Sequence, residues 1–431
     1  MVRITIPATD APALSVVLVT YNAWEWTERA LHALTSTTDL PYELVVIDNA
    51  SHDQTRDRLR DIDNARVVLE DVNRGFGVAA NLGVIMSRAP RVLLLNSDAL
   101  LQPGWLDPLA GILDSEDDVA AVGARLDHVD GSLQEAGSII WGDGASDNYG
   151  DGDDPRRPEY RFRRDVDYLS AACLLVRRSA FCDAGGFDPV YHPAYYEDTD
   201  LAMRWRSMGM RVVYQPRSVA VHKRWASSGD RSGMVPQLLR NRPIFVERWR
   251  ELLGMRPPRP EPEDGASLLA MRDAECVERL LLVTDRLDSS AGAMAAQCAS
   301  ALAGVARNWR VSLLCWDDDA ESDAAEALRA QGIEVTGRGV DVAAWLSFRQ
   351  HHHTAVLADA HLPARIALMV RDAQPHAWRA ALLSGAIDGP APWLAGAQLA
   401  VCNSETDAPD MSSVPAGDVA ALVHRAGLRL A

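Results

Sequence analysis

The stretch VLLLNSDAL, residues 92–100, is a run of aliphatic side chains that stops at a polar triplet. An aliphatic run without alternation is typical of a strand covered on both faces, as in a parallel sheet. Asn96, Ser97 and Asp98 follow directly, so a carboxylate stands where the strand must end. Such residues also begin ordinary turns, because their short side chains bond to nearby backbone. The triplet alone leaves a turn and a ligand site as alternatives.

The same pattern recurs on both sides of this stretch. Further aliphatic or β-branched runs are separated by amphipathic segments of helical length, and they comprise LSVVLVTYN (14–22), YELVVIDNAS (42–51) and ARVVLE (65–70). This strand–helix alternation predicts a doubly wound α/β sheet in the first part of the chain. Polar residues end two of these runs as well, at Thr20-Tyr21-Asn22 and at Asp48. Since such sheets bind ligands beyond the carboxyl ends of their strands, we predict a binding site there.

Length and composition narrow the class of protein. A chain of 431 residues predicts two or three domains, and 48% hydrophobic with 24% charged residues is typical of a soluble globular protein. The net charge of -17 argues against a nucleic-acid partner bound through a basic surface. No run approaches 18 apolar residues, and the scattered cysteines form no CxxC pair, so we expect a cytoplasmic protein with reduced thiols. Peripheral attachment to a membrane surface is left open.

Three segments break the strand–helix pattern. Residues 123–165 are rich in Gly and Asp, and we expect a long irregular loop that is either functional or disordered. Residues 254–267 are rich in Pro and charge and are typical of a linker. A new strand–loop–helix–strand pattern begins near residue 279 and predicts a separate α/β domain.

The segment YYEDTDLAMRWRSMG, residues 195–209, begins with acidic residues and continues as a predicted helix. Acidic residues are favoured in the first turn of any helix. The functional alternative is that one of Glu197, Asp198 and Asp200 is a general base. Three tyrosines around this start could stack on a sugar, namely Tyr191, Tyr195 and Tyr196. His222 ends a predicted strand and is either structural or a metal ligand.

These motifs together carry a family likeness. Residues 14 to about 230 resemble the family-2 glycosyltransferases, specifically the bacterial group that includes rhamnosyltransferases of cell-surface polysaccharide assembly. The matching segments, in order, are VVLVTYN, LVVIDNASHDQT, NRGFGVAANLG, LLLNSDALLQPGWL, SAACLLVRRSAFCDAGGFDPVYHPAYYEDTDLAMRWRSMG and VAVHKR. The resemblance implies an A-type nucleotide-diphospho-sugar transferase fold and an inverting displacement.

The resemblance also implies roles on the donor side. Thr20, Tyr21 and Asn22 look like the nucleotide cradle, and Asp48 looks like the contact to a pyrimidine base. Further nucleotide-side positions are Asn73, Gly77, Asn96 and Ser97. The implied donor is UDP- or dTDP-linked, with dTDP-rhamnose favoured by the group.

The triplet at residues 96–98 stands where the family has its Asp-x-Asp metal motif, with Asn in place of the first carboxylate. Asp98 is therefore expected to hold Mg²⁺ or Mn²⁺ between the two phosphates, and His222 is expected to be a further ligand. Asp198 is the expected general base and Glu197 the second choice. The expected acceptor is a hydroxyl of a saccharide or a lipid-linked saccharide.

The last third resembles the N-terminal half of a family-4, B-type glycosyltransferase. The expected organisation is a catalytic domain at residues 1–253, a linker at 254–278, and a smaller Rossmann-like α/β domain at 279–431 that is accessory to the chemistry. A chain ending near Gly254 is expected to stay folded and to hydrolyse the donor. The alternatives are a non-catalytic carbohydrate-binding or assembly protein on the same fold, and a nucleotidyltransferase, which is disfavoured because no phosphate loop rich in glycine and lysine is present.

Overall fold

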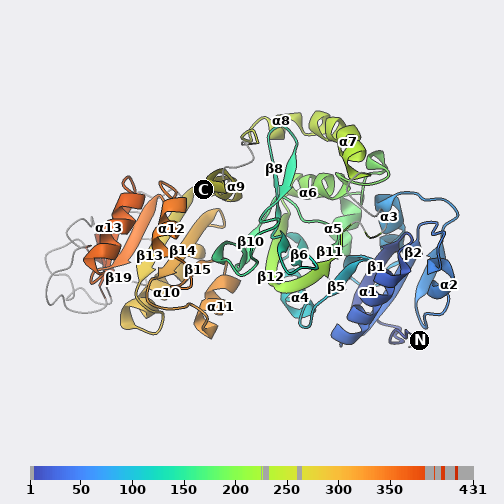
Figure 1. Cartoon of the computed structure of the whole chain (residues 1–431), viewed down its shortest axis with the longest axis horizontal. Coiled ribbons are helices and arrows are strands. Elements are labelled where there is room, and N and C mark those ends of the chain that lie inside the picture. Colours follow the sequence, from blue (N-terminus) through green and yellow to red (C-terminus); the bar gives the residue numbers. More distant parts are fainter. Residues whose placement is uncertain are drawn as a thin grey trace. The chain divides into compact units, whose positions relative to one another are not determined.

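The computed structural model describes residues 4–224, 226, 233–259, 265–383, 393, 399–402 and 413–415. They divide into two compact units (Figure 1). Unit 1 comprises Met1–Arg156 and Arg164–Pro260, and unit 2 comprises Arg157–Arg163 and Glu261–Ala431. Within the described residues, no helix is both long enough and apolar enough to span a membrane.

Unit 1 is built on a mixed sheet with the strand order β10-β12-β6-β11-β4-β1-β2-β3. Its strands are β1 (Leu14–Thr20), β2 (Tyr42–Asp48), β3 (Arg66–Leu69), β4 (Arg91–Asn96), β5 (Ala99–Leu101), β6 (Val119–Asp127), β7 (Leu133–Glu135), β10 (Arg164–Asp165), β11 (Cys173–Arg177) and β12 (Arg211–His222). Strands β3, β2, β1 and β4 are parallel, which confirms the prediction from their continuous aliphatic runs. Strand β11 runs antiparallel to both β4 and β6, so the sheet is not parallel throughout.

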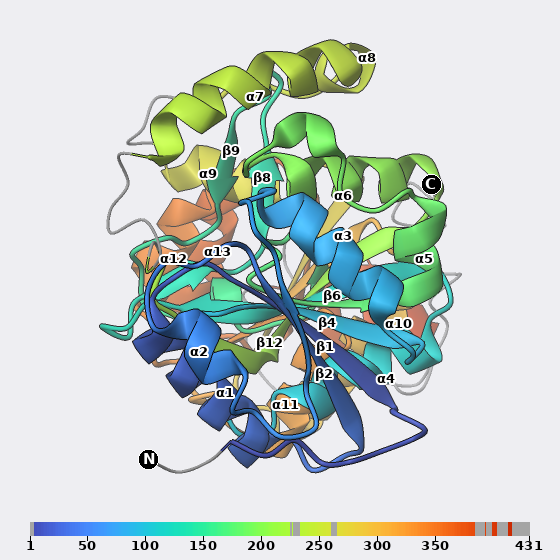
Figure 2. The same ribbon diagram turned by 90° about the vertical axis from the view of Figure 1, so that its right-hand side faces the viewer.

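Helices cover both faces of this sheet (Figure 2). The helices of unit 1 are α1 (Trp24–Thr37), α2 (Thr55–Leu59), α3 (Phe76–Met86), α4 (Leu106–Ser115), α5 (Arg178–Asp183), α6 (Glu197–Ser207), α7 (Met234–Arg248) and α8 (Arg250–Leu253). Helices α7 and α8 lie away from the sheet, and Arg248 of α7 binds Asp200 of α6. Val16 and Leu18 of β1 share one core with residues of α1 and α4. Val17 points to the opposite face, where a Cβ on Gly83 of α3 would lie only 2.3 Å from its Cγ1. Gly83 thus lets α3 lie close to the sheet.

Residues 123–165 differ from the expected irregular loop. Strand β6 continues to Asp127, β7 pairs back on it, and β8 (Ser138–Ile140) forms a hairpin with β9 (Ser146–Asn148). The apolar residues of this stretch are buried, among them Leu133, Ile139, Ile140 and Trp141. The few aliphatic residues are therefore enough to order it, and the segment is part of the fold.

Unit 2 contains a parallel sheet with the order β15-β14-β13-β16-β17-β18-β19. The strands are β13 (Glu278–Thr284), β14 (Trp309–Cys315), β15 (Glu334–Thr336), β16 (Ala355–Asp359), β17 (Trp378–Leu383), β18 (Leu399–Cys402) and β19 (Ser413–Pro415). The helices are α9 (Gly265–Arg272), α10 (Ser290–Ala303), α11 (Asp323–Ala330), α12 (Val342–Phe348) and α13 (Ala364–Ala373). This strand order is that of dinucleotide-binding α/β folds, which confirms the Rossmann-like expectation.

A short piece of the long loop, Arg157–Arg163, belongs to unit 2 and carries a 3₁₀ turn at Pro158–Tyr160. Phe162 is fully buried there, with the guanidinium carbons of Arg272 and Arg310 at 5.3 and 4.9 Å from its ring centroid. The backbone N–H of Arg163 donates to the carbonyl of Arg329 at 3.1 Å. The two units are therefore not contiguous in sequence, in contrast to the expected domain boundaries.

The segment predicted as a linker, residues 254–278, is folded where the structure describes it. Arg256 donates to both carboxylate oxygens of Asp167 at 2.6 and 2.8 Å within unit 1. In unit 2, Arg272 and Asp273 are buried and paired at the end of α9. Residues 260–264 lie outside the described residues. The composition of the segment misled the prediction because its arginines bind carboxylates that are distant in sequence.

Candidate active site

The register of the parallel strands aligns their carboxyl ends. Thr20 pairs with Asp48, and Val19 pairs with Asn96, so β1, β2 and β4 end at one rim. The Asp48 side chain is fully buried, and its Oδ2 accepts the N–H of Ser51 at 3.3 Å. Its Oδ1 has no hydrogen-bond partner within the described structure. A buried carboxylate oxygen that lacks a donor is costly unless a ligand supplies one.

The loop after β1 is held against the loop after β2. Asn22 has the left-handed φ of 57°, its N–H donates to Ser51 Oγ at 2.7 Å, and its Oδ1 accepts the N–H of His52 at 2.7 Å. The Tyr21 ring meets the His52 ring edge-on with centroids 6.4 Å apart. Thr20 is buried at the end of β1. These three predicted residues thus lie together at the rim beside β2.

Asn73 and Gly77 shape the entry into α3. Asn73 Oδ1 accepts the N–H of Gly75 at 2.9 Å, which closes the loop before the helix. A Cβ on Gly77 would lie 3.0 Å from Phe187 Cβ and 3.7 Å from Glu197 Cβ. Gly77 therefore lets α3 pack closely against Phe187. Its predicted contact to the nucleotide stays a prediction.

Asp98 and His222 meet at the end of β4, with Asp98 Oδ1 and His222 Nε2 3.1 Å apart. His222 Nδ1 lies 2.7 Å from Gln134 Oε1, and Nε2 also lies 3.3 Å from Asn96 Nδ2. Ser97 lies half-buried between the two polar residues of the triplet. The structure thus brings together the two residues predicted as metal ligands, although they are 124 positions apart in sequence.

This pair is chemically suited to a divalent cation. When Nδ1–H donates to Gln134, the Nε2 lone pair of a neutral His222 faces a carboxylate, and a cation or a shared proton relieves that contact. Burial raises the pKa of Asp98, but a protonated His222 ring and the N–H of Ala226 outweigh burial and hold the pKa below its usual value. No cluster of three His, Cys, Asp or Glu side chains exists among the described residues. Mg²⁺ and Mn²⁺ sites in nucleotide enzymes need few protein ligands, because water and phosphate oxygens complete them.

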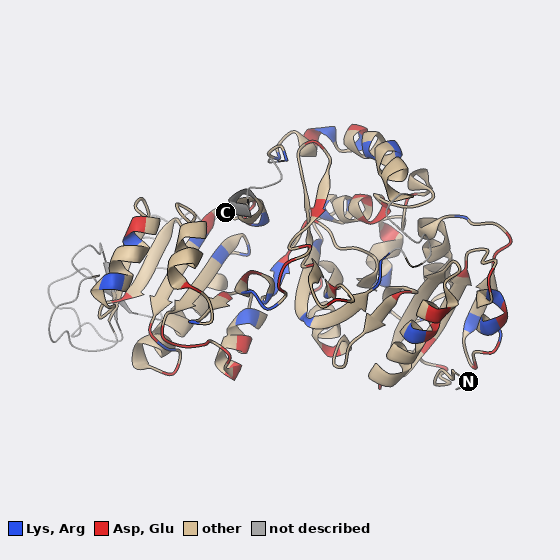
Figure 3. Ribbon diagram, viewed as in Figure 1, with Lys and Arg blue, Asp and Glu red and all other residues tan. Residues whose placement is uncertain are grey.

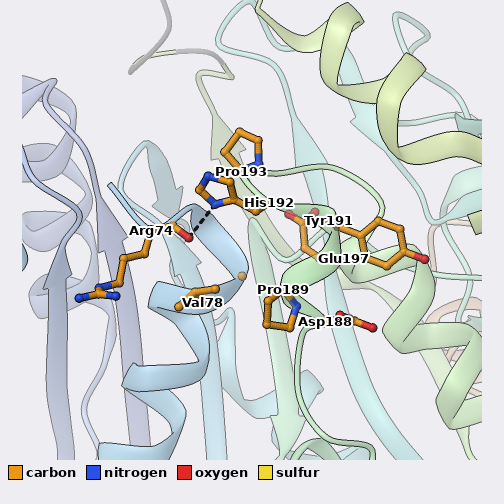
Figure 4. Close-up of a pocket in the computed structure, with 9 residues that line it drawn as sticks. Arg74, Val78, Asp188, Pro189, Tyr191, His192, Pro193 and Glu197 are labelled. Carbon is orange, nitrogen blue, oxygen red and sulfur yellow. Dashed lines mark hydrogen bonds between the residues drawn. The ribbon is translucent and has the colours of Figure 1, made fainter. Parts of the chain in front are cut away.

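Glu197 and Asp198 begin α6 but lie in different surroundings. Glu197 is 6% exposed and lines a small pocket with Arg74, Gly77 and His192 (Figure 4). Its Oε2 has no partner in the described structure. Burial, and then the charge of Asp198, raise the pKa of Glu197 well above its usual value. Burial therefore favours the neutral form of the Glu197 carboxyl.

Asp198 is partly exposed, and its carboxylate accepts a backbone amide. The N–H of Thr199 donates to Oδ1 at 2.8 Å. Burial raises the pKa of Asp198, although hydrogen bonds from Thr199 counteract it. Of the acidic pair, Asp198 is the one with solvent access and a fixed carboxylate.

The predicted tyrosine wall is wrong for two of its three members. Tyr191 and Tyr196 are 1% and 5% exposed, and their rings lie 6.4 Å apart in the core. Tyr191 Oη donates a hydrogen bond to Asp200 Oδ1 at 3.1 Å, and Asp200 also accepts a hydrogen bond from Arg248 of α7. The basic residues of α7 are blue in Figure 3. The aromatic side chains are thus needed to pack α7 against α6. Tyr195 is half-buried and has a left-handed φ of 73°.

Two residues that the sequence did not reveal lie in the segment expected to be irregular. Gln134 orients His222, and Glu135 is 1% exposed with its Oε1 accepting the N–H of Ser170 at 3.1 Å. Both belong to β7. Residues 132–140, SLQEAGSII, do not alternate regularly between apolar and polar side chains, so no periodic signal predicted this strand.

The fold and this acidic rim define an A-type α/β transferase. Residues 15–183 match the family model described as glycosyl transferase family 2. The chain is 33% identical over 241 residues to the N-acetylglucosaminyl-diphospho-decaprenol L-rhamnosyltransferase of Mycobacterium tuberculosis. The aligned region covers 50% of this chain and 78% of that protein. The chain belongs to glycosyltransferase family 2, as the motifs predict.

Other similarities are more distant. The O-antigen biosynthesis protein RfbC of Myxococcus xanthus is 25% identical over 251 residues, which cover 54% of this chain and 19% of that protein. Among solved structures, the crystal structure of GalNAc-T7 with UDP, GalNAc and Mn²⁺ has a TM-score of 0.46 at 16% identity, covering 56% of this chain and 49% of that one.

Proposed function

We propose that the chain is an inverting, metal-dependent transferase that moves a sugar from a UDP- or dTDP-linked donor to a saccharide hydroxyl. The observation that carries this proposal is the Asp98–His222 pair at the end of β4, with His222 Nε2 and Asp98 Oδ1 3.1 Å apart. A divalent cation held there would neutralise the charge that develops on the departing nucleoside diphosphate.

The donor side of the rim supports a pyrimidine nucleotide. The unpartnered Oδ1 of Asp48 would accept the ring N–H of uracil or thymine. Similarity to a rhamnosyltransferase favours dTDP-rhamnose within this class. The remaining donor-side positions of this proposal are Thr20, Tyr21, Asn22, Asn73, Gly77, Asn96 and Ser97.

On the acceptor side, Asp198 is the proposed general base. A hydroxyl is a poor nucleophile until a carboxylate takes its proton as the new glycosidic bond forms, and the partly exposed, amide-held Asp198 has that access. Glu197 is buried and its pKa is raised, so we assign it to holding the start of α6. Similarity to a protein named for a decaprenol-linked acceptor favours a lipid-linked saccharide, met at the inner face of the cytoplasmic membrane.

A paired substitution tests the base. Asp198→Asn should keep donor binding and lower the transfer rate by roughly 10²–10⁴-fold, as expected for a lost general base. Glu197→Gln should change the rate much less. The assignment within the pair is reversed if Glu197→Gln is inactive while Asp198→Asn turns over.

A thermal-shift screen of nucleotide sugars with Mn²⁺ tests the donor class. A true donor at 100 times its Kd should stabilise the fold by about 2.7 kcal/mol. A non-catalytic carbohydrate-binding protein on the same fold, the second candidate, would be stabilised by saccharides but by no nucleotide sugar.

A further inference from the structure

The predicted metal ligand His222 is one member of a chain of hydrogen bonds that runs from the acidic rim to the surface of unit 1. His222 Nε2 lies 3.1 Å from Asp98 Oδ1, and His222 Nδ1 lies 2.7 Å from Gln134 Oε1. Beyond this amide, Gln134 Nε2 lies 3.1 Å from His128 Nδ1, and His128 Nε2 lies 2.7 Å from Asp151 Oδ1. The side chain of Asp151 is 44% exposed. The function proposed above uses neither His128 nor Asp151.

The backbone of His222 fixes the direction of the inner hydrogen bonds. Gln134 is buried, and its Nε2 also lies 3.3 Å from the carbonyl oxygen of His222. A carbonyl oxygen only accepts hydrogen bonds, so the NH₂ end of the amide must face it and Oε1 must face the imidazole. Nδ1 of His222 therefore carries a proton and donates a hydrogen bond to Oε1. The other ring nitrogen, Nε2, is the one that can give its lone pair to a cation beside Asp98.

His128 is the second acceptor for the same NH₂ group. Because Gln134 Nε2 donates to it, Nδ1 of His128 has to present a lone pair, and the ring proton has to be on Nε2. The carboxylate of Asp151 accepts a hydrogen bond from that Nε2 and so favours this tautomer. The backbone N–H of His128 donates to the carbonyl of Ser132 at 2.7 Å, which holds His128 in a tight turn before β7. The two histidines thus bind opposite ends of one amide.

Asp151 also connects this chain to the segment after β12. Arg224 Nη1 lies 3.3 Å from Asp151 Oδ2, while His128 binds the other carboxylate oxygen. The guanidinium therefore balances the charge of Asp151, and no proton on His128 Nδ1 is needed for that purpose. Nδ1 of His128 is left as the acceptor for Gln134.

We propose that His128 is a positioning residue for the cation ligand His222, and that it acts through the orientation of the Gln134 amide. This inference rests on the proposed cation role of Asp98 and His222. Without the acceptor on His128, one N–H of the buried amide has no partner in the present arrangement, so the amide is held less firmly. Rotation of the freed amide would turn its NH₂ group toward Nδ1 of His222, and the ring proton would then move to Nε2. The lone pair that a cation needs would be lost.

The binding test measures the Kd for Mn²⁺ in the full chain by electron paramagnetic resonance, with and without UDP. His128→Phe keeps a flat ring but removes the acceptor, so the Kd should rise by about 10- to 100-fold. His128→Asn can present its side-chain oxygen near the place of Nδ1 and should restore most of the affinity. His32→Phe, at an exposed position of α1, is the matched control and should bind Mn²⁺ as the unsubstituted chain does. Equal affinities of the two His128 variants, or no loss of affinity in His128→Phe, would overturn the proposal.

A second measurement needs neither a cation nor activity. ¹⁵N NMR of the His222 ring in the metal-free full chain should show a proton on Nδ1, and in His128→Phe that proton should be partly lost to Nε2. An Nδ1 without a proton in the unsubstituted protein contradicts the proposal, even if both His128 variants bind Mn²⁺ weakly. If instead the unsubstituted chain binds no Mn²⁺ while the His222 tautomer changes in His128→Phe as expected, the coupling of His128 to His222 stands and the cation role in the proposed function fails.

Discussion

Asp48, Asp98 and Asp198 occupy three different electrostatic settings within unit 1. Asp48 is fully buried with one oxygen unpartnered, Asp98 faces an imidazole, and Asp198 is partly exposed and held by a backbone amide. The settings match a base contact, a cation ligand and a proton acceptor. Each can be removed with an isosteric amide, so single-residue substitutions separate the three roles.

For Asp98, we expect Asp98→Asn to abolish metal-stimulated transfer, with a loss of about 10²-fold or more, because charge stabilisation of the leaving group is a large part of such catalysis. The melting temperature should change little, since the Ala226 N–H still finds an acceptor. Asp114→Asn is the control, because Asp114 is an exposed carboxylate that pairs with Arg91. Full activity of the unsubstituted protein in excess chelator would refute the metal role.

For Asp48, we expect Asp48→Asn to weaken UDP and dTDP binding by about 10- to 100-fold, the value of one hydrogen bond to a charged group. Isothermal titration with UDP, dTDP and GDP measures this. Asp57→Asn, on the exposed surface of α2, should bind as the unsubstituted chain does. Tight binding of GDP with none of UDP or dTDP would show that the base is a purine.

At the scale of elements, α7 holds the turn that precedes Glu197 and Asp198 through hydrogen bonds. Asn241 of α7 is fully buried, and its Nδ2 donates to the carbonyls of Tyr191, Ala194 and Tyr195 at 3.0, 3.0 and 2.9 Å. Tyr195 and Tyr196 have φ of 73° and 77°, a region that costs about 1–3 kcal/mol for a residue other than glycine. The strained turn persists because one amide group binds three of its carbonyls.

Replacing that amide should therefore release the turn. We expect Asn241→Ala to lower the free energy of unfolding by about 2–3 kcal/mol and to lower kcat, because three buried carbonyls lose their donor. Urea unfolding and initial rates measure the two effects. Leu239→Ala removes a side chain that is 68% exposed on the same helix and should change neither. Equal effects of the two substitutions would show that α7 contributes only bulk packing.

The sequence predicted the elements whose signal is local. The aliphatic runs of β1 to β4 and their polar ends identified Thr20, Asp48 and Asp98, because strand burial and strand termination are both encoded in neighbouring residues. Strand β7 was missed, because short strands in a Gly- and Asp-rich segment owe their order to distant partners. The role of Tyr191 was misjudged for a similar reason. Its partner Asp200 is close in sequence, but Arg248, which lies over the Tyr191 ring and binds Asp200, comes from the more distant helix α7.

At the scale of the whole molecule, each unit contains a sheet with carboxylates at the carboxyl ends of its central strands. In unit 2, Asp285 follows β13 and Asp359 ends β16, and the charge of Asp285 adds to burial in raising the pKa of Asp359. Asp318 accepts the N–H of Leu287 at 3.1 Å. In unit 1 the carboxylate of Asp98 faces the imidazole of His222, and the accessory role of residues 279–431 stays a prediction.

The discontinuous units alter how that accessory role can be tested. Phe162 and Glu159 lie in a segment between two parts of unit 1, but they are buried by groups of unit 2, with Glu159 Oε1 3.6 Å from Arg349. A chain that stops before α9 exposes a phenylalanine and leaves Glu159 without Arg349. It should also extend beyond Gly254, because Arg256 binds Asp167 and Arg259 Nε binds Asp147 at 2.8 Å.

We therefore expect three truncated chains to rank in a defined order. Residues 1–259 with Phe162→Ser should be monomeric and should hydrolyse the donor, because the exposed apolar ring is gone and every proposed catalytic group is present. The same chain with Phe162 should aggregate more readily, and a chain ending at Gly254 should melt at the lowest temperature, since the Arg256–Asp167 pair is lost. Light scattering, thermal melting and donor hydrolysis measure the three properties. If the Phe162→Ser chain is folded but binds no nucleotide sugar, while residues 261–431 bind one, the donor site lies in unit 2 and the rim of unit 1 has another role.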